Sequence, residues 1–271
     1  MTQQKKFLWA TDIHLCYYNR LEFVRTINRH NPSGVFLTGD ISHLGFSLYG
    51  DMEYIGRETH CPIYFILGNH SIWFSSFAER YKQVRELCSK YPNLIWMNNV
   101  DVIPLSNEVA LIGNENWYDG TTETTTKKIK FSKAYIDWLL IKDFRELKNM
   151  DERVLKFREI ADKSAEEIGR KLSLALEQDY KRIFILSHMP FWDEATRDVG
   201  TLFDWFWLPY NVNVKTGKVI KEIMKERKKR NVVCLFGHTH SPHWGMLSRN
   251  IEYFVGRPSG YFKSEPQIIY I

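Results

Sequence analysis

The chain has 271 residues, of which 44% are hydrophobic and 25% are charged. This composition is typical of a folded globular protein and excludes a disordered one. The formal net charge of +5 is compatible with anionic substrates, but it is well below that of a dedicated nucleic-acid-binding protein.

The cysteines and the first residues indicate the compartment. Four cysteines are scattered along the chain without a Cys-x-x-Cys spacing, which favours free thiols in a reducing compartment. A short polar start leads directly into an apolar, strand-like run, without the hydrophobic region of a signal peptide. No apolar run approaches the length of a membrane span. We therefore expect a cytoplasmic protein that does not bind membranes, and its oligomeric state stays open.

Short apolar runs recur along the chain, and five of them end in a small cluster of polar residues. Continuous apolar runs are typical of strands that are buried on both faces of a sheet. The five expected strands are Phe7–Ala10, Val35–Thr38, Ile63–Leu67, Ile183–Leu186 and Val232–Phe236. Helical patterns at Leu21–His30 and Phe77–Lys90 lie between the early strands. This alternation indicates an α/β fold with layered sheets and helices.

The second half of the chain begins with a different pattern. From about residue 127 to 180, apolar residues repeat at three- and four-residue spacing, which predicts long helices with one apolar face. We interpret this segment as a helical insertion within a single domain that spans residues 1–271. The basic run Lys225–Arg230 is expected to be a solvated face near a helix C-terminus. Residues 244–271 return to short strands.

Each polar cluster lies at the carboxyl end of an expected strand, where α/β sheets bind their ligands. Together the clusters supply Asp12, His14, Asp40, Asn69, His70, His188, His238 and His240. Carboxylates and neutral imidazoles form a mixed N/O ligand set that suits Mn, Fe, Zn, Co or Ni ions. Two such ions with a shared carboxylate ligand could activate water and polarise a phosphoryl group.

The motifs Asp12-Ile-His14, Gly39-Asp40, Gly68-Asn69-His70, Ser187-His188 and Gly237-His238-Thr-His240 resemble, in this order, the calcineurin-like metallophosphoesterases. The resemblance implies a four-layer α/β/β/α sandwich with a helical insertion. It also implies a hydrolase that cleaves a phosphodiester or phosphomonoester, with nucleotides among the candidate substrates. The reaction would proceed by attack of a hydroxide that bridges two divalent metal ions, with Mn, Fe or Zn as the expected metals.

The resemblance also implies roles for individual residues. Asp12, His14 and His240 would bind one ion, Asn69, His188 and His238 would bind the other, and Asp40 would bridge them. His70 would stabilise the developing charge or protonate the leaving alkoxide. The residue that follows is commonly acidic in this family, but here it is Ser71, which cannot supply charge. We expect either a less effective His70 or compensation by a carboxylate such as Glu115 or Asp119.

Other residues near the motifs have simpler explanations. Isolated histidines such as His30, His43 and His60 are expected to be structural, whereas His243 lies close enough to His240 to reach the site. Aromatic residues near the motif loops could stack on a planar leaving group, although core packing explains most single rings. The candidate substrate contacts are Asn116, Trp117, Tyr210 and Asn213.

Three functional readings remain open. The first is hydrolysis of a small phosphate ester. The second is a nuclease that acts on DNA or RNA with the same site, but it would need a continuous basic groove, and the basic residues are dispersed except at Lys225–Arg230. The third is a catalytically weak metal-binding scaffold, although such proteins lose ligands and this chain keeps the whole set. No motif of another hydrolase or nucleotide-binding class is present.

Overall fold

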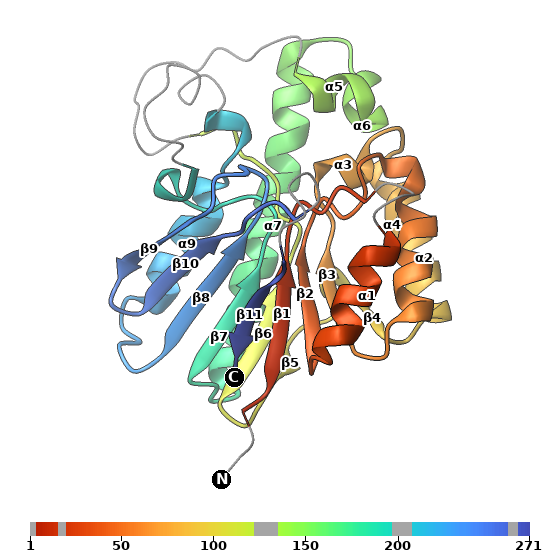
Figure 1. The fold of residues 1–271 in the computed structure, drawn as a ribbon. Helices are drawn as coiled ribbons and strands as arrows, with labels where there is room; N and C mark the ends of the chain where they lie inside the picture. Colours follow the sequence, from red (N-terminus) through yellow and green to blue (C-terminus); the bar gives the residue numbers. More distant parts are fainter. Residues whose placement is uncertain (1–3, 16–19, 122–134, 197–207, 260–264) are drawn as a thin grey trace.

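The computed structural model describes residues 4–15, 20–121, 135–196, 208–259 and 265–271. Two sheets pack face to face, and helices cover the outer face of each sheet (Figure 1). This α/β/β/α order of layers confirms the predicted fold class.

The first sheet has the strand order β11-β1-β2-β3-β4. Its strands are β1 (Lys6–Ala10), β2 (Gly34–Thr38), β3 (Ile63–Ile66), β4 (Leu94–Trp96) and β11 (Gln267–Tyr270). Strands β1 to β4 are parallel, and β11 pairs antiparallel with β1 at the edge. The helices on its outer face are α1 (Arg20–His30), α2 (Leu48–Glu58) and α4 (Phe77–Lys90).

The second sheet has the strand order β5-β6-β7-β8-β10-β9. Its strands are β5 (Ile103–Pro104), β6 (Val109–Gly113), β7 (Arg182–Leu186), β8 (Asn231–Phe236), β9 (His243–Ser248) and β10 (Ile251–Val255). The four central strands are parallel, whereas β5 and β9 pair antiparallel at the two edges. Helices α7 (Met150–Glu177) and α9 (Val214–Met224) pack on its outer face.

The side chains of each central strand alternate between two cores. In β1, Phe7 and Trp9 point into the core between the sheets, whereas Leu8 and Ala10 point toward the covering helices. Strand β7 follows the same rule, with Phe184 and Leu186 between the sheets. Because both faces are buried, the positions in the interior of these strands are apolar. This explains the continuous apolar runs, and all five strands predicted from them are confirmed.

The segment with helical periodicity contains α5 (Ile136–Leu140), α6 (Lys142–Arg145) and α7, while residues 122–134 lie outside the described part. Helix α7 buries one face, as predicted, and contacts α9 and β6. The basic residues that follow α9 are exposed, as predicted. Among the described residues, no helix is both long and apolar enough to span a membrane. The sequence did not predict α2 or the strands β4, β5 and β6.

One buried cation interrupts the apolar face of α7. The side chain of Lys171 is completely buried, and its Nζ donates hydrogen bonds to the carbonyl oxygens of Met97 (2.7 Å) and Gly113 (3.0 Å). Gly113 is the last residue of β6, and Met97 begins the short 3-10 helix η2 (Met97–Asn99). Lys171 therefore ties α7 to the carboxyl end of β6, next to the loops that follow the strands.

Replacing Lys171 by Met should lower the free energy of unfolding by about 2 kcal/mol, because two buried carbonyl groups lose a charged donor. Urea denaturation monitored by circular dichroism would measure the change. Lys163→Met, on the exposed side of the same helix, is the control and should change the stability by less than about 0.5 kcal/mol. Equal stabilities of the two variants would contradict the role assigned to Lys171.

Candidate metal centre

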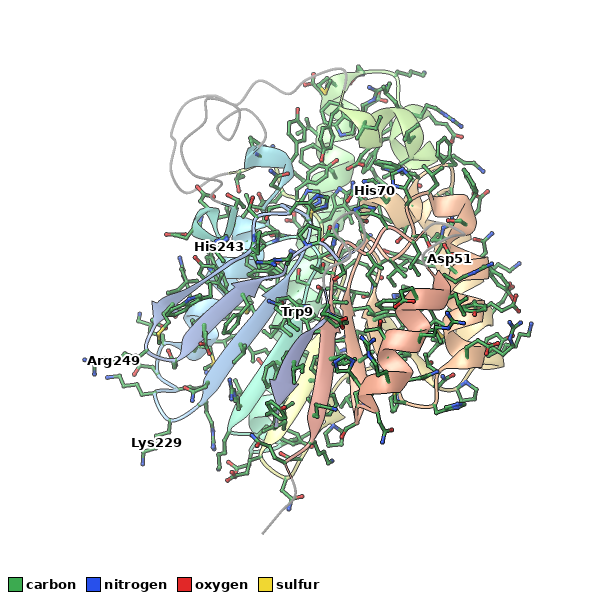
Figure 2. The ribbon with its side chains drawn as sticks, viewed as in Figure 1. Trp9, Asp51, His70, Lys229, His243 and Arg249 are labelled. Atoms are coloured by element: carbon green, nitrogen blue, oxygen red, sulfur yellow. The ribbon has the colours of Figure 1, made fainter. Side chains whose placement is uncertain are left out.

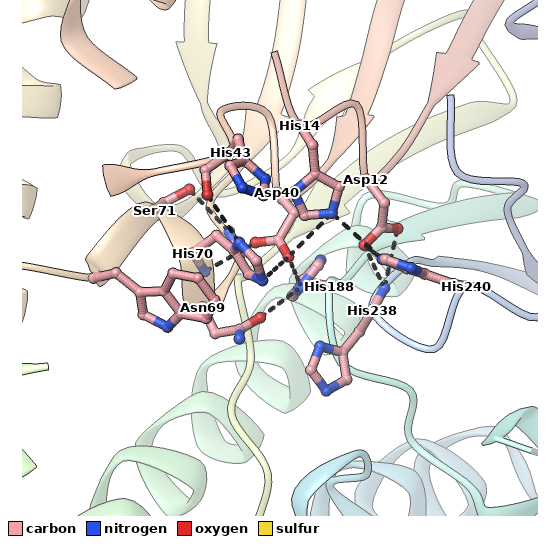
Figure 3. Close-up of polar contacts among 12 residues, drawn as sticks. Asp12, His14, Asp40, His43, Asn69, His70, Ser71, His188, His238 and His240 are labelled. Atoms are coloured by element: carbon pink, nitrogen blue, oxygen red, sulfur yellow. Dashed lines mark hydrogen bonds and ion pairs between the residues drawn. The ribbon is translucent and has the colours of Figure 1, made fainter. Parts of the chain in front are cut away.

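The expected ligands lie beyond the carboxyl ends of five strands from both sheets. Asp12 and His14 follow β1, Asp40 follows β2, Asn69 follows β3, His188 follows β7, and His238 and His240 follow β8. Because these strands point the same way within each sheet and the sheets pack face to face, their ends meet at one edge (Figure 3).

The Asp40 carboxylate lies at the centre of the cluster. Its Oδ2 is 3.5 Å from His188 Nε2, 3.7 Å from His70 Nε2 and 4.0 Å from His14 Nε2. Its Oδ1 accepts a hydrogen bond from the backbone N–H of His70 (3.1 Å). Asp40 is almost fully buried, so the surrounding imidazoles replace water as its partners. This position is suitable for a ligand shared between two ions.

A first group of ligand atoms belongs to Asp12, His14 and His240. Their ligand atoms lie within 4.8 Å of one another. Asp12 Oδ1 is 3.1 Å from His240 Nε2, and the two imidazole Nε2 atoms are 3.4 Å apart. The hydroxyl of Thr11 donates to Asp12 Oδ2 (2.7 Å) and fixes the carboxylate. One carboxylate and two imidazoles form a donor set that suits a borderline divalent ion.

A second group surrounds His188. Its Nδ1 donates to the carbonyl oxygen of Thr38 (2.9 Å), which leaves Nε2 to face Asp40 and Asn69 Oδ1 (3.2 Å). The ring of His238 packs edge-on against that of His188, with 5.1 Å between ring centroids, and its Nε2 is 3.0 Å from Asn211 Oδ1. The structure therefore brings six of the seven expected ligands together, and His238 adjoins them through its ring contact with His188 and through its backbone N–H, which donates to Asp12 Oδ1 (3.1 Å).

The charges in the cluster compensate one another. Burial would raise the pKa of Asp40, but the charges of His188 and His70 hold it well below its usual range. Burial would likewise lower the pKa of His188, but the Asp40 charge raises it to about 9. Burial lowers the pKa of His14 to about 4, which keeps this imidazole neutral. Ions that bind here would take over the compensating role of the proton on His188.

The backbone at the strand ends is strained. Asp12, His14, Asp40, His238 and His240 all have positive φ angles, from 43° at Asp40 to 69° at His238. Residues with a Cβ rarely adopt this left-handed conformation, and those that do cluster at functional sites, where the surrounding structure enforces it. The strain therefore marks the strand ends as a site that the fold has to maintain.

Two of the motif glycines allow the ligands to approach the backbone. A Cβ atom at Gly68 would lie 2.1 Å from Asp40 Oδ1, and one at Gly39 would lie 2.3 Å from His188 Nδ1. Gly39 also has a φ angle of +92°, which favours glycine. Any larger residue at either position would therefore collide with the side chain of a proposed metal ligand.

His70 is oriented by the backbone and by a ring. Its Nδ1 donates to the carbonyl oxygen of His43 (3.0 Å), and its imidazole stacks on Trp73 with 3.5 Å between ring centroids. Ser71 is turned away, with its Oγ 3.4 Å from the backbone nitrogen of Gly68. The group that orients His70 is thus a main-chain carbonyl.

The carboxylates that were expected to compensate for Ser71 have other partners. Glu115 accepts hydrogen bonds from Trp96 Nε1 and Asn98 Nδ2. Asp119 accepts from the backbone N–H groups of Thr121 and Lys215. Compensation at His70 by Glu115 or Asp119 is therefore wrong, because both carboxylates are committed to hydrogen bonds elsewhere in the scaffold.

Two histidines outside the expected set of metal ligands lie near the motif loops. His43 was expected to be structural, yet its ring nitrogen lies within 4.8 Å of those of His14 and His70. Its position three residues after Asp40, on the same loop, was the only signal in the sequence. The sequence left open whether His243 reaches the site, and its two ring nitrogens contact the carbonyl oxygens of Ser241 and Glu194 instead.

The four candidate substrate contacts are buried. Asn213 Nδ2 donates to Asn116 Oδ1 (2.8 Å), and the Asn213 side chain also caps α9. Tyr210 is fully buried and stacks on Tyr135 with 4.0 Å between ring centroids. Trp117 is also buried, and with Asn116 it lines two cavities. One of about 380 Å³ has no expected metal ligand in its wall, whereas a small one of about 10 Å³ is also lined by Asn69 and His188. All four side chains pack within the scaffold, and their contact with a substrate stays a prediction.

Gly68→Ala should abolish normal metal binding, because the new Cβ would displace the Asp40 carboxylate. Metal content after dialysis, measured by mass spectrometry, would test this. Gly50→Ala in α2 is a matched control, since nothing lies within 4 Å of that Cβ position, and it should bind metal like the wild type. Metal binding by Gly68→Ala at the wild-type level would contradict the assigned geometry.

Known proteins are similar to this chain in sequence or in fold. The chain is 23% identical over 250 residues to the uncharacterized protein L509 of Acanthamoeba polyphaga mimivirus, a match that covers 86% of this chain and 83% of the relative. Among solved structures it is similar to a dimetal phosphatase from Danio rerio, with a TM-score of 0.55 and 10% identity over 93% of this chain and 87% of that one.

A second similar structure is TT1561 of Thermus thermophilus, with a TM-score of 0.55 and 11% identity over 95% of this chain and 91% of that one. These structural likenesses concern the fold. The family is identified by sequence, since the profile described as calcineurin-like phosphoesterase matches residues 5–242. Because this match spans most of the chain, the protein belongs to the calcineurin-like phosphoesterase family.

Proposed function

We propose that the chain hydrolyses a small phosphate ester at the strand-end cluster, with Asp40 as the ligand shared by two divalent ions. Membership of the family implies a phosphoesterase with a pair of divalent metal ions. The observation that carries the assignment of the site is the Asp40 carboxylate, with the Nε2 atoms of three histidines within 4.0 Å of its Oδ2.

The donor set fits two ions. Asp12, His14 and His240 would hold one, and Asn69 and His188 would hold the other. We propose that His238 completes the second set when its ring exchanges Asn211 for the ion. The mixed N/O ligands favour Mn, Fe or Zn. When bound, such ions supply the positive charge that polarises a phosphoryl group and makes water acidic.

The exposure of the histidines supports a direction of approach. His43 and His70 are partly exposed and His240 is 42% exposed, whereas Asp12 and Asp40 are buried. An ester would therefore reach the cluster past the imidazoles. With Nδ1 of His70 bonded to the His43 carbonyl, Nε2 is the atom that can hold a proton for the leaving alkoxide.

The distribution of basic residues supports a small substrate over a nucleic acid. The run Lys225–Arg230 precedes β8, whereas His238 follows it, so the run and the cluster lie at opposite ends of the sheet. Figure 2 shows Lys229 and Arg249 far from His70. A nuclease would need cations beside the reacting phosphate, so we place hydrolysis of DNA or RNA second.

Metal-stripped protein should regain hydrolysis of aryl phosphodiesters or monoesters when Mn, Fe or Zn is restored. Asp40→Asn should reduce this turnover about 10²–10³-fold, because the shared negative ligand is lost. Asp119→Asn, a buried carboxylate outside the cluster, should keep the turnover of the wild type. If the metals bind but no ester is hydrolysed, the hypothesis of a catalytically weak metal-binding scaffold replaces this proposal. The ratio of diester to monoester turnover assigns the substrate class.

His70→Gln should slow hydrolysis of esters with poor leaving groups about 10²–10⁴-fold, the usual contribution of a general acid. Esters with good leaving groups need less proton transfer and should be affected much less. A series of aryl esters of rising leaving-group pKa would give the slope of log kcat for each protein. His30→Gln, whose imidazole contacts the Thr26 carbonyl in α1, serves as the control. Equal slopes for wild type and His70→Gln would exclude this role.

A further inference from the structure

A buried carboxylate from helix α5 lies next to a proposed ligand of the metal centre. Asp137, the second residue of α5, is completely buried. Its Oδ1 accepts hydrogen bonds from Asn69 Nδ2 (3.0 Å) and from the indole Nε1 of Trp73 (2.7 Å). Asn69 is a proposed metal ligand, and the ring of Trp73 stacks on His70. One oxygen atom of Asp137 therefore accepts hydrogen bonds from the proposed metal ligand Asn69 and from Trp73, the residue that packs against the expected acid His70.

We propose that Asp137 is a positioning residue, which turns the Asn69 amide oxygen toward the metal site and holds Trp73 beneath His70. This inference rests on the proposed function. It assigns the α5 segment a part in the reaction that neither the motifs nor the family match assigns.

The orientation of an amide depends on its partners, because its oxygen accepts and its nitrogen donates. Only the oxygen of Asn69 can bind a cation. Because Oδ1 of Asp137 accepts both hydrogen bonds, it selects the orientation in which Asn69 Nδ2 faces Asp137. Asn69 Oδ1 then lies 3.2 Å from His188 Nε2, on the side of the cluster. Groups that orient metal ligands in this way commonly affect metal affinity about 10- to 100-fold.

The same carboxylate acts on His70 through Trp73. The indole donates to Asp137 at its nitrogen, and its ring lies 3.5 Å from the imidazole at an interplanar angle of 28°. The His43 carbonyl holds Nδ1 of the same imidazole. The imidazole is thus fixed at its face and at one nitrogen, although Ser71 contributes no charge.

The α5 segment is firmly attached at this position. The backbone N–H of Phe74 donates to the carbonyl of Leu140 (2.9 Å), and that of Lys142 donates to the carbonyl of Ser75 (3.0 Å). Both bonds join the segment to the connection between α3 (Asn69–Ile72) and α4. The next residue after Asp137, Trp138, is fully buried and donates to Tyr118 Oη (3.2 Å). The carboxylate therefore has a fixed location relative to Asn69.

The test is the affinity of each zinc ion, measured by competition with a chromophoric chelator on metal-stripped, full-length protein. Asp137→Leu, which has the same branched shape but no acceptor, should weaken one of the two ions about 10- to 100-fold and leave the other unchanged. Asp137→Asn keeps an acceptor oxygen and should recover most of this loss. If Asp137→Leu does not accumulate as folded protein, Asp137→Ser, whose oxygen is too short to reach both donors, should give the same loss.

The control is Asp143→Leu, which removes a carboxylate from the neighbouring helix α6 that accepts a scaffold hydrogen bond from the backbone of Phe77 (2.9 Å). It should bind both ions like the wild type. Two ions bound with unchanged affinity by Asp137→Leu, or an equal loss in Asp143→Leu, would overturn the inference while leaving the proposed function intact. A wild-type protein that binds no zinc, manganese or iron would instead overturn the proposed function.

Discussion

The structure is organised around a carboxylate that is buried away from solvent. Asp40 is buried at the end of β2, and a buried charge is costly unless other charges and hydrogen bonds replace its hydration. Here the replacements come from histidines on three different loops and from one backbone amide. The positive φ angles and the glycines beside the ligands follow from this requirement, since they let the imidazoles and the main chain come close enough.

The cluster also depends on the face-to-face packing of the two sheets. The first sheet contributes Asp12, His14, Asp40 and Asn69, and the second contributes His188, His238 and His240. The aromatic and aliphatic core between the sheets sets their separation, and Phe36 and Phe184 contact each other across it. Packing in this layer and ligand geometry at its edge are thus parts of the same constraint.

The sequence predicted the layers and most ligands because both leave strong local patterns. Strands buried on two faces give continuous apolar runs, and polar residues directly after such runs stand out. The contribution of Asp137 had no such pattern. It lies 68 residues from Asn69 on a five-residue helix that is too short for a periodic signal. The mutual hydrogen bond of Asn116 and Asn213 also had no such pattern, because polar side chains near a motif can bond to each other or to a ligand.

Ligands divided between two sheets have a consequence for cohesion. An ion bound by both Asp12 and His240 would link the end of β1 to the end of β8. It would thus cross-link two sheets that otherwise pack against each other mainly through apolar side chains. The free energy of its binding adds to that of folding whenever the folded form binds it better than the unfolded chain does. The free energy of unfolding is therefore expected to rise with the concentration of free metal ions. Catalytic activity and stability would be gained or lost together.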